Sequence, residues 1–282
     1  GFGAAFAAWL KLGVVAEYLP MDYGKVETPE DFDMKVSLAA KGNTIYILDF
    51  SFPRSVMEAL FAHAEKVVWL DHHASVFKDW GVPLDDVADE LILGLVQPND
   101  HTVILDNNKS GAMLAWEYFH PGTEVPKLIQ HIDDRDRWVF ALPGSKELHA
   151  AMNSLKPWTF SQWDMLFHVD GSRLEALKDE GAAILRAHNQ HVQATLKQAR
   201  KSVIVPAIID SAASYKAPCV WGNSTEFGDF CFASGLAANA PAFLASDLGH
   251  ELANKSRTFG LVWSMAGDGQ VHCSLRSNGE YD

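Results

Sequence analysis

The stretch Val67-Val68-Trp69-Leu70-Asp71-His72-His73 joins an apolar run to three polar side chains that can bind metals. A short, continuous apolar run is typical of a strand that is buried on both faces of a parallel sheet. In open α/β sheets, ligands bind just beyond the carboxyl ends of such strands. The stretch therefore predicts a buried parallel strand with a functional site at its carboxyl end.

A second predicted strand upstream has the same design. The segment Thr44–Leu48 is largely apolar and is followed by Asp49. Because parallel strands end at the same edge of a sheet, Asp49 and the residues Asp71–His73 should lie close together. Carboxylate oxygens with imidazole nitrogens suit borderline ions such as Mn²⁺ or Zn²⁺ better than Ca²⁺. The alternative is that Asp71 caps a turn and that the histidines are ordinary loop residues.

Strands and helices alternate through the first half of the chain. Hydrophobic spacing and stop signals predict helices and extended segments in the order 4–12 (helix), 14–19 (extended), 44–48 (strand), 55–64 (helix), 66–70 (strand), 102–105 (strand) and 110–119 (helix). Such alternation is typical of parallel sheets with helices on both faces. We therefore predict an α/β fold whose first domain is a doubly wound, mainly parallel sheet.

The pattern changes near Arg173. From there to about Arg200, apolar residues recur at intervals of 3, 4 or 7, which predicts a long amphipathic helix. Short β-type runs follow, and the last two, 258–264 and 270–275, flank a hairpin signal at Ala266–Gly269. The expected organisation is a catalytic domain at 1–172, a connector helix at 173–201 and a smaller α/β C-terminal domain at 202–282.

The composition and net charge of the chain limit its possible binding partners and its cellular location. The formal net charge of −13 repels long duplex nucleic acid, although bound divalent cations would still allow a small anionic substrate. No apolar run reaches the roughly 20 residues that span a bilayer, and Gly1–Leu12 is typical of a helix rather than a signal peptide. Three cysteines without a CxxC pair favour a reducing compartment. We expect a cytoplasmic protein without membrane contact, with a homodimer as one option for its assembly.

A further acidic cluster, Asp133-Asp134-Arg135-Asp136, lies at the end of a predicted helix over 125–131. It can supply the ligand that the strand-end site still lacks, from either Asp134 or Asp136, and spacing alone does not choose between them. The alternative is a solvated helix end whose charges pair with one another.

Together, Asp49, Asp71–His73 and Asp133–Asp136 resemble motifs II, III and IV of the DHH phosphoesterase family. This family includes RecJ exonucleases, nanoRNases, cyclic-dinucleotide phosphodiesterases and family II pyrophosphatases. The resemblance covers most of the chain. It implies a DHH catalytic domain, a DHH-associated C-terminal domain and two Mn²⁺ ions, with Mg²⁺ or Co²⁺ as substitutes.

The resemblance also implies roles for individual residues. Asp49 would bridge the two Mn²⁺ ions, and His72 and Asp134 would be further metal ligands. His73 would contact the phosphoryl group, while Asp71 would orient its neighbours; these two form the expected catalytic pair.

Two other segments resemble substrate-binding motifs of the family. Cys273–Ser277 resembles the Ser-x-Arg-Ser pattern of the DHH-associated domain, which implies that Arg276 and Ser277 bind a substrate phosphate. Asp106–Ala112 resembles a Ser/Gly-rich helix start, which implies that Ser110 contacts substrate. The alternatives are a surface arginine on a strand edge and a helix N-cap.

The sequence also departs from the family pattern. The His-x-Asp-x-Asp-Gly of motif I is missing, and Gly1–Ala5 resembles the residues that follow it. The glycine-rich Gly-Gly-Gly-His segment is missing after Asp282. The sequence thus resembles a member clipped at both ends, with an incomplete C-terminal domain.

The predicted function is a two-Mn²⁺ phosphoesterase acting on phosphodiester or phosphoanhydride bonds of a small nucleotide. A short oligonucleotide or a cyclic or linear dinucleotide is the expected substrate. One alternative is a pyrophosphatase or exopolyphosphatase, although family II pyrophosphatases carry a different C-terminal domain. Another is a non-catalytic nucleotide-binding protein on the same fold.

Overall fold

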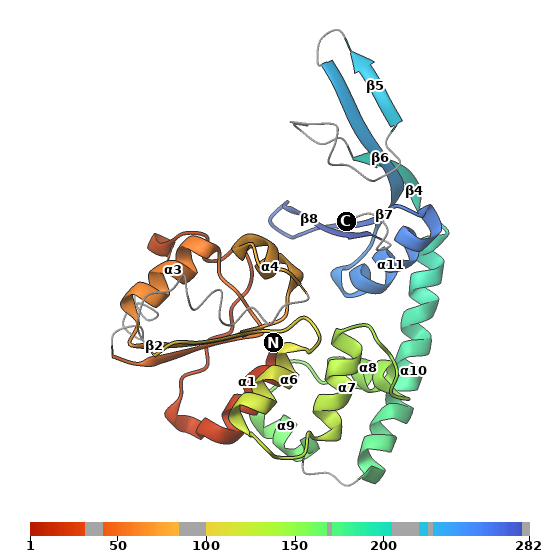
Figure 1. Ribbon diagram of the computed structural model, residues 1–282. Coiled ribbons are helices and arrows are strands. Elements are labelled where there is room, and N and C mark those ends of the chain that lie inside the picture. Colours follow the sequence, from red (N-terminus) through yellow and green to blue (C-terminus); the bar gives the residue numbers. More distant parts are fainter. Residues whose placement is uncertain (32–41, 85–99, 168–170, 205–219, 225–227, 278–282) are drawn as a thin grey trace. The chain divides into compact units, whose positions relative to one another are not determined.

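The computed structural model describes residues 1–31, 42–84, 100–167, 171–204, 220–224 and 228–277 (Figure 1). The chain forms two compact units, Gly1–Ala182 and Ala183–Asp282. The first unit contains a parallel three-stranded sheet and the second a mixed five-stranded sheet, which confirms the predicted α/β class. None of the helices in the described ranges combines the length and apolar character that a membrane crossing requires.

The sheet of the first unit consists of three parallel strands in the order β1 (Thr44–Leu48), β2 (Lys66–Asp71) and β3 (Thr102–Leu105). In their register, Leu48 pairs with Leu70, and Asp71 pairs with Leu105. The central strand β2 is buried along almost its whole length, as its apolar sequence predicts. All three predicted strands are confirmed, and their carboxyl ends meet at one edge.

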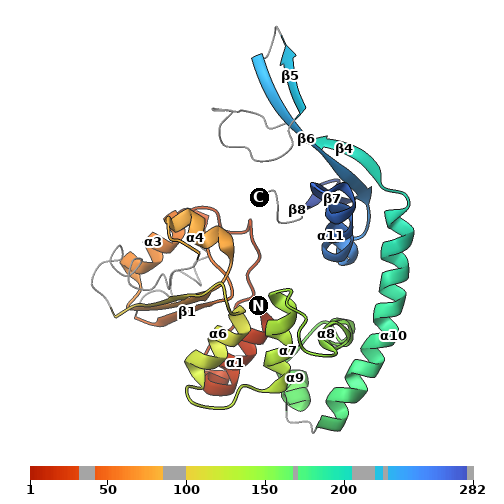
Figure 2. The same cartoon turned by 45° about the vertical axis from the view of Figure 1, so that its right-hand side comes forward.

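Helices cover both faces of this sheet because its side chains alternate in direction. Val67 and Trp69 pack on one face, and Val68 and Leu70 pack on the other. The first face is covered by α3 (Arg54–His63) and α4 (Ala74–Trp80). The second is covered by α1 (Phe2–Leu12), α6 (Gly111–Phe119) and α7 (Lys127–Asp136). Figure 2 shows the strands edge-on between these two layers, which is the doubly wound arrangement expected.

Two more helices, α8 (Ser145–Ser154) and α9 (Phe160–Phe167), extend the layer that contains α1 and α7. Their apolar side chains form a separate buried cluster with α1, centred on Phe6, Met152 and Trp163. The helix α10 (Gly171–Leu196) follows and contributes to both units. This confirms the predicted long helix, which ends a few residues earlier than expected.

The second unit is built on the strands β4 (Arg200–Ile204), β5 (Val220–Ser224), β6 (Gly228–Asn239), β7 (Phe259–Met265) and β8 (Val271–Ser277). The order is β4-β6-β7-β8, with β5 paired to β6; only the β6–β7 pair is parallel. The helix α11 (Ala245–Ser256) packs its Leu248 and Leu252 against Val262. The predicted β7–β8 hairpin is confirmed.

The predicted extended segment at 14–19 is wrong at its start, although Ala16 has extended backbone angles. Residues Gly13–Val15 form a short 3₁₀ helix, and the chain that follows pairs with no described strand. The side chains of Val14 and Val15 are 94% and 88% exposed. Their β-branched composition suggested a strand, but strand propensity has little effect where no neighbouring strand supplies a pairing edge.

Candidate metal centre

Asp49, Asp71, His72 and His73 gather at the carboxyl edge of the first sheet. Each offers one potential ligand atom, and these four atoms lie within 4.8 Å of one another. The backbone N–H of Asp49 donates to the carbonyl oxygen of Leu70 at 2.8 Å, which extends the β1–β2 ladder by one residue. The sequence-based expectation that the two strand ends meet is therefore confirmed.

Asp71 is fully buried and uses both carboxylate oxygens within the protein. Its Oδ1 accepts the backbone N–H of His72 at 2.7 Å and lies 2.6 Å from Nδ1 of His73. Its Oδ2 accepts the hydroxyl of Ser51, which in turn accepts the indole N–H of Trp69 at 2.9 Å. A carboxylate held this way fixes the position of the His73 ring. The orienting role in catalysis that the family resemblance implies for Asp71 stays a prediction.

His73 extends from this pair toward solvent, with its side chain 39% exposed. The hydrogen bond to Asp71 raises the pKa of His73, although partial burial opposes this effect. Because Nδ1 faces Asp71, Nε2 is left for another partner. The ring of Tyr23 lies 6.2 Å from the imidazole, and burial with the charges of Asp71 and Asp49 raises the pKa of Tyr23 to about 12. Sequence reasoning missed this neutral phenol because its loop carries no recognisable motif.

Asp49 has a strained backbone conformation and a buried carboxylate oxygen. Its φ of 55° lies in the left-handed region, which is costly for a residue other than glycine. Its Oδ1 is buried without a hydrogen-bond partner among the described residues; Nε2 of His72 lies 3.1 Å away but outside hydrogen-bond geometry. Its Oδ2 lies 2.6 Å from the amino group of Gly1. Burial raises the pKa of Asp49, whereas the neighbouring His72 lowers it.

The start of α6 lies directly against Asp49. A Cβ atom at Gly111 would be 2.2 Å from Oδ1 of Asp49 and 2.3 Å from its Cβ, so only glycine fits there. The preceding residue, Ser110, is fully buried, and its side chain caps the helix by accepting the N–H of Met113 at 3.2 Å. The structure therefore supports the capping alternative for Ser110, because a hydroxyl buried in a helix cap offers no surface to a substrate.

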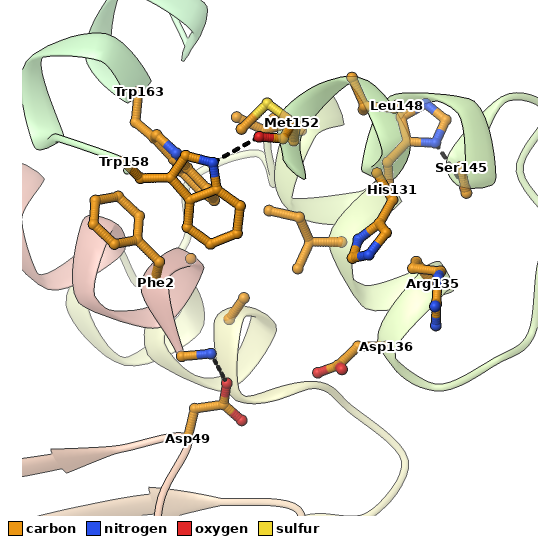
Figure 3. A pocket seen from close by; sticks show the side chains of 16 residues that line it. Phe2, Asp49, His131, Arg135, Asp136, Ser145, Leu148, Met152, Trp158 and Trp163 are labelled. Carbon is orange, nitrogen blue, oxygen red and sulfur yellow. Dashed lines mark hydrogen bonds and ion pairs between the residues drawn. The ribbon is translucent and has the colours of Figure 1, made fainter. Parts of the chain in front are cut away.

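The structure separates the two acids that spacing left open. Asp134 is buried, and its carboxylate accepts the N–H of Ala141 at 2.7 Å, the N–H of Leu142 at 3.1 Å and the hydroxyl of Ser145 at 2.5 Å. The Oδ2 of Asp136, by contrast, lies 3.5 Å from Nε2 of His72. Figure 3 shows Asp136 across from Asp49. The choice of Asp134 as metal ligand does not fit this geometry, and Asp136 does.

A matched pair of variants tests this assignment. Asp136→Asn should leave the free energy of unfolding within about 0.5 kcal/mol of wild type, because Asp136 makes no buried hydrogen bond to the residues that the structure describes, while Mn²⁺ affinity falls at least tenfold. Asp134→Asn should destabilise the protein by about 1–3 kcal/mol, since it weakens three hydrogen bonds to a buried carboxylate. Urea unfolding and Mn²⁺ titration of both variants measure these effects. The opposite pattern would assign the metal role to Asp134.

The predicted phosphate-binding residues of the second unit lie on β8. Nη2 of Arg276 is 3.3 Å from the hydroxyl of Ser246, and the side chain packs along α11, where a Cβ at Gly249 would lie 2.9 Å from Cγ of Arg276. Ser277 stands opposite Phe259 in the β7–β8 ladder. Binding of phosphate by Arg276 and Ser277 stays a prediction.

A pocket of about 160 Å³ lies beside the metal-competent cluster, within the first unit (Figure 3). Asp49 and Asp136 line one part of it, and the aromatic side chains of Phe2, Trp158 and Trp163 line another. Hydrophobic patterning does not reveal this pocket, because its walls come from five separate helices, the residue after β1 and the loop before α9.

Comparisons with known proteins attach no function to the chain. No family model matches the sequence, and no solved structure matches it. The chain is 25% identical over 155 residues to an uncharacterized protein of Acanthamoeba polyphaga mimivirus; the match covers 52% of this chain and 33% of the viral protein. The matched region thus spans about a third of that relative's length. The resemblance to DHH phosphoesterases stays a prediction.

Proposed function

We propose that this chain is a metal-dependent phosphoesterase. The observation that carries the proposal is the cluster of Asp49, Asp71, His72 and His73 at the carboxyl edge of a doubly wound parallel sheet. This edge is where α/β folds bind ligands. The resemblance to DHH phosphoesterases predicts the same chemistry from the sequence of these residues.

The donor atoms at this edge fit a divalent ion. Asp49 has a buried oxygen without a hydrogen-bond partner in the described chain, and a cation would stabilise a carboxylate in this position. His72 adds an imidazole nitrogen and Asp136 a second carboxylate. Such mixed oxygen and nitrogen donors suit Mn²⁺, with Co²⁺ or Mg²⁺ as substitutes. These three residues would hold the proposed pair of ions.

The remaining residues would act on the substrate. Bound divalent ions would supply an activated water and would neutralise charge on the phosphoryl group. The carboxylate of Asp71 fixes the ring of His73 through Nδ1, so that a protonated Nε2 can donate to a phosphoryl oxygen. The raised pKa of His73 favours that protonated form. Asp71 is a positioning residue, since both of its oxygens are already engaged.

The proposed substrate is a small nucleotide, either a short oligonucleotide or a cyclic or linear dinucleotide. The net charge of −13 disfavours long duplexes, whereas a short phosphodiester needs only local cations. We propose that the first unit is the catalytic domain and that α10 connects it to a substrate-binding domain. In that second domain Arg276 would grip a phosphate through its guanidinium group, with Ser277 beside it.

Variants at His73 test the catalytic role. His73→Asn should keep the bond to Asp71, since its amide nitrogen replaces Nδ1, but it removes Nε2. Turnover should therefore fall about 10²–10⁴-fold while Mn²⁺ affinity changes little. Hydrolysis of a dinucleotide in the presence of Mn²⁺ and a parallel Mn²⁺ titration measure the two quantities. Unchanged turnover would remove His73 from the mechanism. A wild-type chain that binds the dinucleotide without hydrolysing it would instead be a nucleotide-binding protein.

A further inference from the structure

The pocket beside Asp49 and Asp136 has the size of a single ring. Its volume is about 160 Å³, and a cavity of about 150 Å³ accepts a benzene-sized molecule. Part of its wall is aromatic: the ring centroid of Phe2 lies 4.9 Å from that of Trp163 and 5.5 Å from that of Trp158. Aromatic side chains stack on planar nucleobases of any kind.

His131 lines the same pocket, and its hydrogen bonds fix its tautomer. The hydroxyl of Ser145 has one hydrogen, which it donates to the ionised carboxylate of Asp134 at 2.5 Å. Ser145 Oγ also lies 2.8 Å from Nδ1 of His131 and must accept there, so Nδ1 carries the hydrogen of the imidazole. Burial and the charge of Lys178 lower the pKa of His131, which keeps the ring neutral. Its Nε2 is thus an acceptor, and it has no partner in the described part of the chain.

Trp163 supplies an unused donor. Its Nε1 is buried and has no hydrogen-bond partner among the described residues, although its ring lines the pocket. The neighbouring Trp158 differs, since its Nε1 donates to the carbonyl oxygen of Met152 at 2.7 Å (Figure 3). This N–H has almost no exposed area, so an acceptor on a bound ligand would reach it only after a small shift of the ring. A buried N–H without a partner is costly, which would favour such a shift.

We propose that this pocket binds a planar six-membered heterocycle that carries an N–H donor and a carbonyl acceptor, the chemistry of a uracil base. The ring would lie against Phe2 and Trp163, with its N–H toward Nε2 of His131. The base would belong to a nucleotide whose phosphoryl group lies at Asp49 and Asp136; this placement of the phosphate rests on the proposed function.

Calorimetric titration of the whole chain with nucleosides tests the pocket without metal or phosphate. Uridine should bind, whereas adenosine should bind at least tenfold more weakly because its six-membered ring has neither an N–H donor nor a carbonyl group. Uridine methylated at N3 should also bind at least tenfold more weakly, since it has the same ring but no N–H donor. Equal affinities for the three nucleosides, or no binding of uridine, would overturn the proposal.

A variant of His131 adds a matched control. His131→Asn keeps an N–H for Ser145 but has no counterpart of Nε2. It should bind uridine about fivefold more weakly, which is the loss of one hydrogen bond, while its affinity for N3-methyluridine stays unchanged. If this variant bound uridine with wild-type affinity, His131 would have no role in binding the base.

Hydrolysis of bis(p-nitrophenyl) phosphate with Mn²⁺, measured in parallel, separates this inference from the proposed function. This ester does not depend on recognition of a base. Hydrolysis without selective uridine binding would overturn the pocket assignment alone. Selective uridine binding without hydrolysis would overturn the phosphoesterase proposal and leave a uracil-binding site.

Discussion

Asp49→Asn is expected to lower Mn²⁺-dependent hydrolysis at least 10³-fold, or about 4 kcal/mol in activation free energy. The variant keeps the shape of the side chain, and asparagine tolerates the left-handed φ of 55° at this position. What it removes is the negative charge on a buried oxygen that has no hydrogen-bond partner among the described residues. Steady-state hydrolysis of a dinucleotide, together with thermal unfolding to confirm the fold, measures the effect.

Asp106 provides the matched control, because it is another acid at a strand end, directly after β3. Its Oδ1 accepts the N–H of Asn108 at 2.8 Å, and its other oxygen lies 3.7 Å from Nζ of Lys109. Asp106→Asn should therefore change hydrolysis by no more than about twofold. If Asp49→Asn retained activity as well as Asp106→Asn does, the bridging role of Asp49 would be untenable.

Gly111→Ala is expected to destabilise the protein by about 1–3 kcal/mol and to abolish Mn²⁺ binding. Alanine is normally more stable than glycine in a helix by about 1 kcal/mol, so a loss of stability here identifies a steric cause. The added methyl group would fall 2.2 Å from Oδ1 of Asp49 and would displace the carboxylate from the cluster. Urea unfolding and Mn²⁺ titration measure both effects.

A double variant distinguishes the steric cause from a general defect of α6. Asp49→Gly removes the side chain that the new methyl group would meet, and glycine accepts the positive φ at this position. Asp49→Gly combined with Gly111→Ala should thus be more stable than Gly111→Ala alone, yet should still bind no Mn²⁺. Wild-type stability and Mn²⁺ affinity of Gly111→Ala would show that the close packing is not required.

The central strand of the first unit was predictable because it is buried on both faces of the sheet. The run Val67–Leu70 is apolar at every position, and the structure buries every one of these side chains. The segment that begins at Val14 is also β-branched and apolar, but it lies exposed beside a 3₁₀ turn. Local propensity cannot supply the neighbouring strand that would make such a segment part of a sheet.

The strand-end part of the site was predictable for the same reason. Topology alone brings Asp49 to Asp71–His73, once both strands are parallel neighbours. The choice between Asp134 and Asp136 was not predictable, because two residues apart on a helix means nearly opposite faces. Which face of α7 meets the sheet depends on how the helix packs. Asp134 accepts hydrogen bonds from backbone N–H groups of the loop after α7.

The contacts of Gly111 and of His131 could not be predicted from the sequence either. The first depends on an interatomic distance between α6 and the residue after β1, which no spacing encodes. The second depends on a hydrogen-bond chain from Asp134 through Ser145 to His131, which joins two helices. The resemblance to a known family pointed to the acids and histidines of the cluster but not to these supporting contacts.

The central claim is that the strand-end cluster holds divalent ions, and a Mn²⁺ titration followed by electron paramagnetic resonance tests it most directly. The signal of free Mn²⁺ disappears as the ion binds, so the method counts bound ions without requiring turnover. We predict saturable binding of two Mn²⁺ ions by the wild-type chain and at least tenfold weaker binding by Asp49→Asn. Absence of saturable binding, or equal binding by the two proteins, would contradict the claim.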